Sequence, residues 1–152
     1  MRELLNYAKA SPAAVAALRG MESYVRGCGR SPTLLELMRV RASQINGCAY
    51  CIDMHSKDAR AAGETEQRLY GLAAWRDTTW FDERERAVLA WTEAVTTLAQ
   101  APVPEQLYDD LRRHFSEKEI ADLTLAVAMI NSWNRLAAPL RWPEPGSYQP
   151  RK

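Results

Sequence analysis

Helix start signals recur along the whole of this 152-residue chain and limit its fold more than any other feature. Ser-Pro pairs at residues 11–12 and 31–32 place a hydroxyl residue before a proline at the first helical position, where the missing N–H does no harm. Capping boxes begin at Asp82 and Ser116, each with a glutamate three residues later. Because apolar residues follow helical spacing and β-branched runs are missing, the sequence predicts an all-α fold.

About six to seven helices are expected in a single domain over residues 1–152, with its core at about 15–140. They are expected near 12–26, 32–45, 48–62 and 65–75, then from 83 to a stop at Pro102, from 104 to 114, and from 117 onward. Val88, Trp91, Val95 and Leu98 recur at steps of three and four and form one apolar face. Residues 120–130 are apolar on almost every side, which predicts a central helix covered by its neighbours or by another subunit.

Composition argues against several classes of partner. Twenty Lys+Arg against nineteen Asp+Glu leave a net charge of +1, and the charges are interspersed, so neither nucleic acid nor an anionic membrane is favoured. No apolar stretch approaches the ~20 residues that span a bilayer, and the first residues lack a signal-peptide core. Three cysteines are an odd number, which argues against a secreted disulfide framework and fits a reducing compartment. We therefore expect a soluble protein of the cytoplasm.

Two thiols, an imidazole and a carboxylate have spacings typical of a redox site. Cys48 and Cys51 lie three apart, so on a helix their β-carbons are roughly 5–6 Å from each other, close to what a disulfide needs. His55 lies four residues after Cys51 on the same helix face, where the imidazole can exchange a proton with that thiol. Glu36 lies in an apolar stretch, so we expect desolvation to raise its proton affinity. Helix-dipole reasoning alone favours Cys48, at the helix N-terminus, as the acidic thiol, but the imidazole favours Cys51.

A zinc site is the alternative use of the same residues. Cys48, Cys51, His55 and Glu36 could supply four ligands. On a continuous helix, however, Cys48 and His55 lie about 10.5 Å apart, too far to bind one metal ion. We therefore expect no metal ligand in this chain. Cys28, between two glycines, has no partner by spacing, and His114 fits a surface position at a helix C-terminus.

The spacing Glu36-x11-Cys48-x2-Cys51-x3-His55 closely resembles the signature of the alkylhydroperoxidase D (AhpD) family, within the carboxymuconolactone decarboxylase-like superfamily. Residues 39–48 and 51–55 are similar to the core domain of that family, and residues 130–135 resemble the ending of its small members. The resemblance implies an all-helical fold that assembles into trimers or hexamers. It also implies that Cys51 attacks the peroxide, that Cys48 resolves the sulfenic acid into a disulfide, and that Glu36 and His55 relay protons.

The chain departs from the best-known peroxidases of that family at Tyr50, where they have a histidine. A phenol does not replace an imidazole as a base near neutral pH, so dithiol redox chemistry is a firmer expectation than strong peroxidase activity. The predicted function is a thiol-dependent peroxidase or dithiol–disulfide oxidoreductase with no bound cofactor. Its partners would be a hydroperoxide and an external dithiol, such as a lipoyl-bearing or thioredoxin-like protein. The alternatives are a zinc-stabilised binding module and a non-enzymatic thiol redox sensor.

Overall fold

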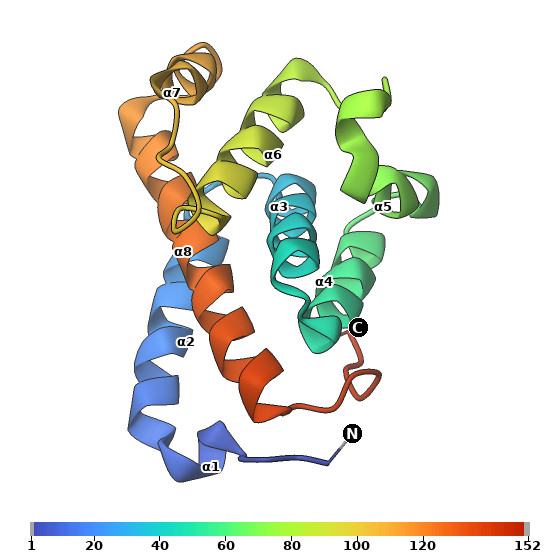
Figure 1. The fold of residues 1–152 in the computed structure, drawn as a ribbon, viewed down its shortest axis with the longest axis vertical. Coiled ribbons are helices and arrows are strands. Elements are labelled where there is room, and N and C mark those ends of the chain that lie inside the picture. The colour runs from blue at the N-terminus through green and yellow to red at the C-terminus, as the bar shows by residue number, and fades with distance from the viewer. Residues whose placement is uncertain (1, 151–152) are drawn as a thin grey trace.

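The computed structural model describes residues 2–150, which form eight α-helices and one 3₁₀ segment and contain no strand (Figure 1). The all-α prediction is confirmed. In chain order the elements are α1 (Tyr7–Ala10), α2 (Pro12–Gly27), α3 (Pro32–Asn46), α4 (Ala49–Ala61), α5 (Glu66–Gly71), the 3₁₀ segment η1 (Leu72–Asp77), α6 (Glu83–Thr96), α7 (Glu105–Arg112) and α8 (Glu117–Leu140).

The helix starts agree with the sequence signals, although one signal acts differently from expectation. Both capping boxes form: Asp82 and Ser116 each accept a hydrogen bond from the backbone N–H three residues on, and the glutamate there accepts one in return. Ser11 and Ser31 make no side-chain cap, and the hydroxyl of Ser31 instead lies 2.7 Å from Thr33 Oγ1. At these two starts the proline of the first turn is the effective signal.

Two helix ends differ from prediction. The helix expected at 65–75 is divided, since α5 stops at Gly71 and the following 3₁₀ segment contains Ala74 in a non-helical conformation. The α6 helix stops at Thr96, where the hydroxyl of Thr97 bonds back to the carbonyl of Glu93 over 2.8 Å. Leu98 therefore falls outside the predicted apolar face and is 58% exposed.

The most enclosed helix is α3, which packs against α4, α6 and α8 (Figure 1). Every residue from 34 to 40 is buried, including Glu36 and Arg39. Because these two residues are charged, the hydrophobicity pattern of the sequence does not identify α3 as a central helix. The predicted central stretch at 120–130 of α8 is also covered, chiefly by α2, α3 and α6, and within it only Ala121 and Ala128 are exposed. Its apolar surface is thus satisfied within one subunit. Among residues 2–150, none of the helices has both the length and the apolar character needed to cross a bilayer.

Two apolar clusters fill the space on either side of α3. One joins α2, α3, α6, α7 and α8, with Met38, Val88 and Val127 among its buried members. The other joins α3 to α4, α5, η1 and α6 through residues such as Leu37 and Leu72. The C-terminal end of α3 and the start of α4 project beyond both clusters and meet the last turns of α8, where the two motif cysteines lie.

Candidate active site

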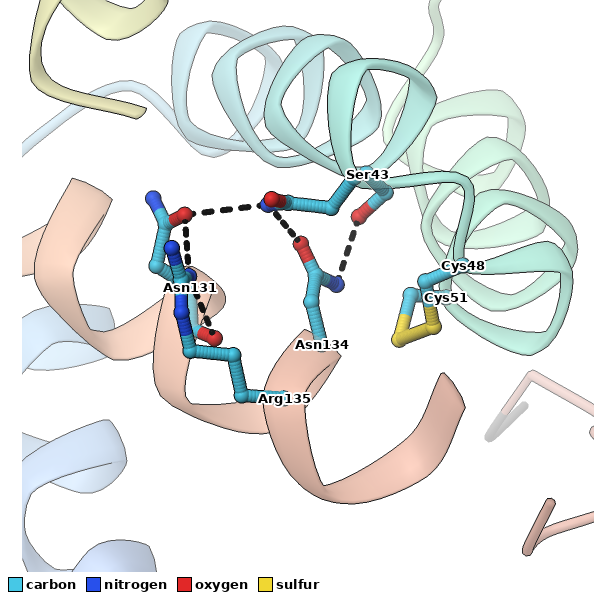
Figure 2. The surroundings of a disulfide bond; sticks show 7 residues. Ser43, Cys48, Cys51, Asn131, Asn134 and Arg135 are labelled. Carbon is cyan, nitrogen blue, oxygen red and sulfur yellow. Dashed lines mark hydrogen bonds between the residues drawn. A yellow bond between two sulfur atoms is a disulfide. The ribbon is translucent and has the colours of Figure 1, made fainter. Parts of the chain in front are cut away.

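The two motif cysteines are joined by a disulfide at the turn between α3 and α4 (Figure 2). Gly47 ends α3 in the left-handed conformation, with φ 66°, and the chain then reverses into Cys48, which is the N-cap of α4 as predicted. The Cα atoms of Cys48 and Cys51 lie 5.3 Å apart, within the range that a disulfide spans. Cys48 is 1% exposed and Cys51 is 2% exposed, so the disulfide is almost completely shielded from solvent.

A buried amide network holds this turn against α8 (Figure 2). The Asn46 amide donates to Asn131 Oδ1 over 2.9 Å and to Asn134 Oδ1 over 2.8 Å. The Asn134 amide in turn donates to Ser43 Oγ over 3.1 Å, and Arg135 donates to Asn131 Oδ1 over 2.7 Å. Sequence reasoning did not place these residues in the site, although two asparagines three apart, directly after the apolar stretch at 120–130, were a visible signal.

A cavity of about 520 Å³ adjoins the disulfide on the side of Cys48. Its walls come from the start of α4 at residues 48–50, from Ala137 and Ala138 of α8, and from Arg141 and residues 143–145 of the following tail. Cys51 does not line it. A molecule in this pocket, which we call the Cys48 pocket, would therefore meet Cys48 first.

Tyr50 lies at this pocket and packs against the two cysteines. Burial and the negative charges of Asp53 and Asp58 raise the pKa of its phenol above the ordinary 10.0. The group is therefore protonated at neutral pH and cannot serve as the base that a histidine would provide. The sequence-based concern about this position is strengthened by its surroundings.

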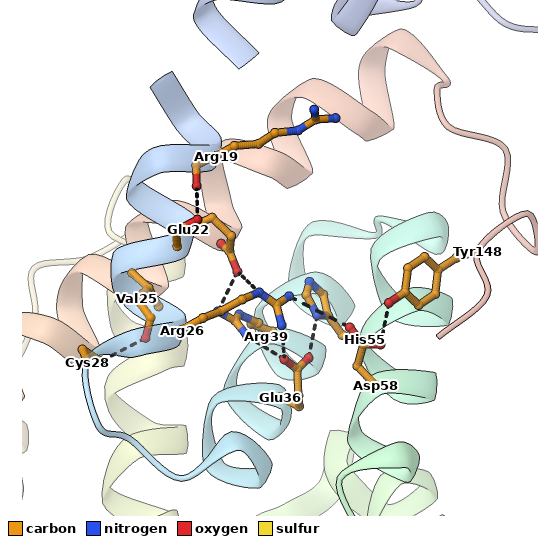
Figure 3. Close-up of polar contacts among 11 residues, drawn as sticks. Arg19, Glu22, Val25, Arg26, Cys28, Glu36, Arg39, His55, Asp58 and Tyr148 are labelled. Carbon is orange, nitrogen blue, oxygen red and sulfur yellow. Dashed lines mark hydrogen bonds and ion pairs between the residues drawn. The ribbon is translucent and has the colours of Figure 1, made fainter. Parts of the chain in front are cut away.

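His55 and Glu36 form a buried pair one helical turn beyond Cys51 (Figure 3). His55 Nδ1 lies 2.6 Å from Glu36 Oε2, and both residues are less than 5% exposed. No hydrogen bond links the imidazole to either cysteine in the part of the chain that the structure describes, with the disulfide closed. The structure therefore brings the four predicted residues into two adjoining pairs.

The expectation that desolvation raises the proton affinity of Glu36 is wrong. Burial does raise the pKa of this carboxyl group, but the hydrogen bond with His55 and the positive charges of His55, Arg39 and Arg26 outweigh it. The pKa is consequently below the ordinary 4.5. Glu36 is a permanent anion near neutral pH, suited to orienting and stabilising a protonated imidazole rather than to donating a proton.

Further charges surround this pair in a network that links α2, α3, α4 and the C-terminal tail (Figure 3). Arg39 donates to Glu36 Oε1 over 2.5 Å and to Glu22 Oε1 over 2.8 Å. Arg26 lies 3.8 Å from Glu36 Oε1 and 4.0 Å from Asp58 Oδ2. Glu22, Arg26 and Asp58 come from other helices than Glu36, so their spacing along the chain carries no signal. Arg39 lies three residues after Glu36 on α3, a spacing that was visible in the sequence.

The structure assembles a different set of possible metal ligands from the one weighed in the sequence. One oxygen or nitrogen atom from each of Glu36, His55 and Asp58 lies within 4.8 Å of the others, whereas Cys48 and Cys51 are bonded to each other. Both carboxylates already face the guanidinium of Arg26. The group is consequently neutralised by arginine, which opposes the binding of a second cation.

The remaining candidates lie outside the site. Cys28 is a free thiol at the end of α2, where its Sγ donates to the carbonyl of Val25 over 3.0 Å. His114 follows α7, half-buried, with its backbone N–H on the carbonyl of Leu111. In residues 2–150, neither residue has a hydrogen bond or ion pair with the disulfide or with the His55–Glu36 pair.

Comparison with known proteins places the chain in a family. Residues 9–94 match the carboxymuconolactone decarboxylase family. The uncharacterized protein YdfG of Bacillus subtilis strain 168 is 40% identical over 137 residues, which cover 90% of this chain and 93% of the relative.

Solved structures with the same fold support this family assignment. A protein of unknown function from Agrobacterium tumefaciens, proposed to be the antioxidant defence protein AhpD, has a TM-score of 0.90 at 41% identity, over 99% of this chain and 100% of the other. The alkylhydroperoxidase AhpD core of a peroxidase-related protein from Ralstonia eutropha JMP134 shares the fold, with a TM-score of 0.77 at 21% identity over 88% of this chain and 71% of that one. The chain therefore belongs to the carboxymuconolactone decarboxylase family and is an AhpD-like member of it.

Proposed function

We propose that this protein is a dithiol–disulfide oxidoreductase that reduces hydroperoxides in an antioxidant role. The observation that carries the proposal is the shielded Cys48–Cys51 disulfide, which adjoins a pocket on one side and lies one helical turn from the buried His55–Glu36 pair on the other. A reversible disulfide needs two thiols that meet without backbone movement and a nearby group that moves protons, and this arrangement is suited to both. The likeness to AhpD supports the same conclusion.

The oxidative half of the cycle begins with both cysteines reduced. The Cys51 thiolate attacks the outer oxygen of the hydroperoxide, the O–O bond breaks, and the alkoxide leaves as an alcohol after taking up one proton. The sulfur is oxidised to a sulfenic acid, and the Cys48 thiol then condenses with it, releasing water and closing the disulfide. His55, held by Glu36, would receive and return the protons in these steps.

The reductive half requires an external dithiol. Because the pocket is lined by Cys48 and not by Cys51, the incoming thiolate would attack the Cys48 sulfur and expel the Cys51 thiolate. The second thiol of the reductant then displaces Cys48, so the reductant leaves as its own disulfide and both cysteines are reduced. A thiolate beside an imidazole is a good leaving group, which is consistent with Cys51 as the more acidic thiol.

Steady-state consumption of a hydroperoxide in the presence of several dithiols tests the proposal. We expect turnover with at least one dithiol, and we expect Cys51→Ser to abolish it, whereas Cys28→Ser, which removes the thiol outside the site, should retain it. A protein that forms the disulfide once but never turns over with any dithiol would be a redox sensor and not an enzyme. Stoichiometric zinc, retained after purification without added metal, would instead support a zinc-stabilised module.

A further inference from the structure

The tail that follows α8 is attached to the rest of the molecule at both of its ends. At the near end, Trp142 packs edge-on against Tyr7, with ring centroids 4.7 Å apart. At the far end, the Tyr148 hydroxyl donates to Asp58 Oδ1 over 2.6 Å, and Lys57 Nζ donates to the Tyr148 carbonyl over 3.0 Å. Lys57 and Asp58 both belong to α4, so the tail runs from α8 to the helix that begins at the disulfide (Figure 1).

The residues between the two attachments form one wall of the Cys48 pocket. Pro143, Glu144 and Pro145 line this cavity. Gly146, with φ 87°, and Ser147, whose N–H and hydroxyl both donate to the Glu144 carbonyl, then turn the chain toward α4. Two prolines restrict the backbone of the wall, so its position depends on the attachments at either end.

We propose that residues 141–148 are a strap that limits the size of the molecules that reach Cys48, and that the Tyr148–Asp58 hydrogen bond is its fastening. The strap admits a slender dithiol and excludes bulkier molecules that carry the same reactive groups. A cavity of about 520 Å³ lies within the range that holds one small molecule. This inference rests on the proposed function for the identity of those reactive groups.

The chemistry of the fastening suits a contact that holds and still releases. The acceptor is a carboxylate, and hydrogen bonds to charged acceptors are stronger than those between neutral groups. Burial and the bond to Asp58 raise the pKa of Tyr148 to about 12, so its hydroxyl remains a donor over the neutral range. Tyr148 is nevertheless only half-buried and lies in a segment without helix, so its release disrupts no core packing.

Reduction of the disulfide by two reagents of equal chemistry and different bulk tests the strap. The reagents are dithiothreitol and the same dithiol attached to polyethylene glycol. Each transfers two electrons and two protons to the Cys48–Cys51 disulfide and leaves as its own disulfide. A Cys28→Ser background ensures that the only thiols counted, by mass after quenching with N-ethylmaleimide, are the two formed in the reaction.

With Tyr148 intact we expect the polymer-bound dithiol to be slower by at least about tenfold. Tyr148→Phe removes one hydrogen bond to a charged group and should raise the population of the open strap by about tenfold. The ratio of the dithiothreitol rate to the polymer-bound dithiol rate should decrease by the same factor. Lys57→Met removes the hydrogen bond from Lys57 Nζ to the Tyr148 carbonyl and should decrease the rate ratio as well.

Tyr24→Phe is the matched control, because Tyr24 donates to Asp122 Oδ1 over 2.9 Å between α2 and α8, away from the strap, and it should keep the original ratio. Equal rates for the two reagents before any substitution would overturn the proposal. An unchanged ratio in both strap variants, or an equal narrowing in Tyr24→Phe, would also overturn it. Since no peroxide is involved, a protein that fails to consume peroxide but shows the narrowed ratio would refute the proposed function and leave the strap standing.

Discussion

His55 Nδ1 lies 2.6 Å from Glu36 Oε2, and this contact joins α4 to α3 inside the protein. Because one ring nitrogen is engaged by a carboxylate, the orientation of the imidazole and its tautomer are set by Glu36. The carboxylate is in turn held by Arg39. The acid–base group beside the cysteines is therefore preorganised by charges that are themselves buried.

Replacing the imidazole should slow the oxidation of the thiols. We expect His55→Gln to decrease the rate of disulfide formation with a hydroperoxide by roughly 10²- to 10⁴-fold, the range for the loss of a general acid or base. Stopped-flow measurement under single-turnover conditions gives this rate. The control is His114→Gln, the same substitution at the other histidine of the chain, which should leave the rate unchanged. A rate within twofold of the original in His55→Gln would remove the imidazole from the mechanism.

Glu36 should make the stability of the fold depend on pH in the acidic range. Its folded-state pKa lies below 4.5, so its ionic contacts contribute fully above pH 4.5 and are lost as the pH falls through the folded-state value. Glu36→Gln removes a negative charge that neutralises the buried guanidinium of Arg39, and it should decrease the free energy of unfolding by about 3 kcal/mol at pH 7. That deficit should shrink below pH 4.5 in urea titrations. The same substitution at exposed Glu117 should produce no such pH-dependent deficit, and a deficit in Glu36→Gln that stays constant down to pH 3 would contradict this account.

The amide network should be needed to hold the disulfide turn. Asn134→Ala removes the partner of Ser43 Oγ and one partner of Asn46, and buried groups left without partners cost about 1–3 kcal/mol. Urea denaturation measures the loss in unfolding free energy. Ser132→Ala is the comparison, because that hydroxyl bonds to the Ala128 carbonyl of its own helix and not to any residue of the network. If the two variants lose equal stability, the network does not stabilise the turn.

Assembly into a trimer or hexamer stays a prediction. The prediction rests on the family resemblance alone, because the neighbouring helices of one subunit already cover residues 120–130. Three or six chains of 17.2 kDa correspond to roughly 52 or 103 kDa with closed symmetry. Light scattering at low micromolar concentration measures this mass, and a stable 17.2 kDa species there would reject the prediction.

The parts of the fold that were predictable from sequence depend on local contacts. The capping boxes at Asp82 and Ser116 and the left-handed Gly47 involve residues within one turn, so their patterns are legible in the chain. The spacing of Cys48, Cys51 and His55 likewise placed them correctly around the first turns of α4.

The rest depends on contacts between elements that are distant in the chain. The lowered pKa of Glu36 depends on His55 of α4 and Arg26 of α2, and the attachment of Tyr148 to Asp58 spans 90 residues. A hydropathy pattern reads charged residues as exposed, so it could not identify α3 as the enclosed helix or give the direction of the pKa shift of Glu36.

The most direct test of the proposed mechanism is to trap the sulfenic acid with a dimedone-type probe, after one equivalent of hydroperoxide is added to each reduced variant that lacks one of the two motif cysteines. We expect Cys48→Ser to be labelled at Cys51 and to recycle slowly, because attack needs only that thiol whereas closure of the disulfide needs its partner. Cys51→Ser should consume no peroxide in a single turnover. Labelling of Cys48 in the Cys51→Ser variant, at the rate of the intact protein, would contradict the account and reverse the roles of the two thiols.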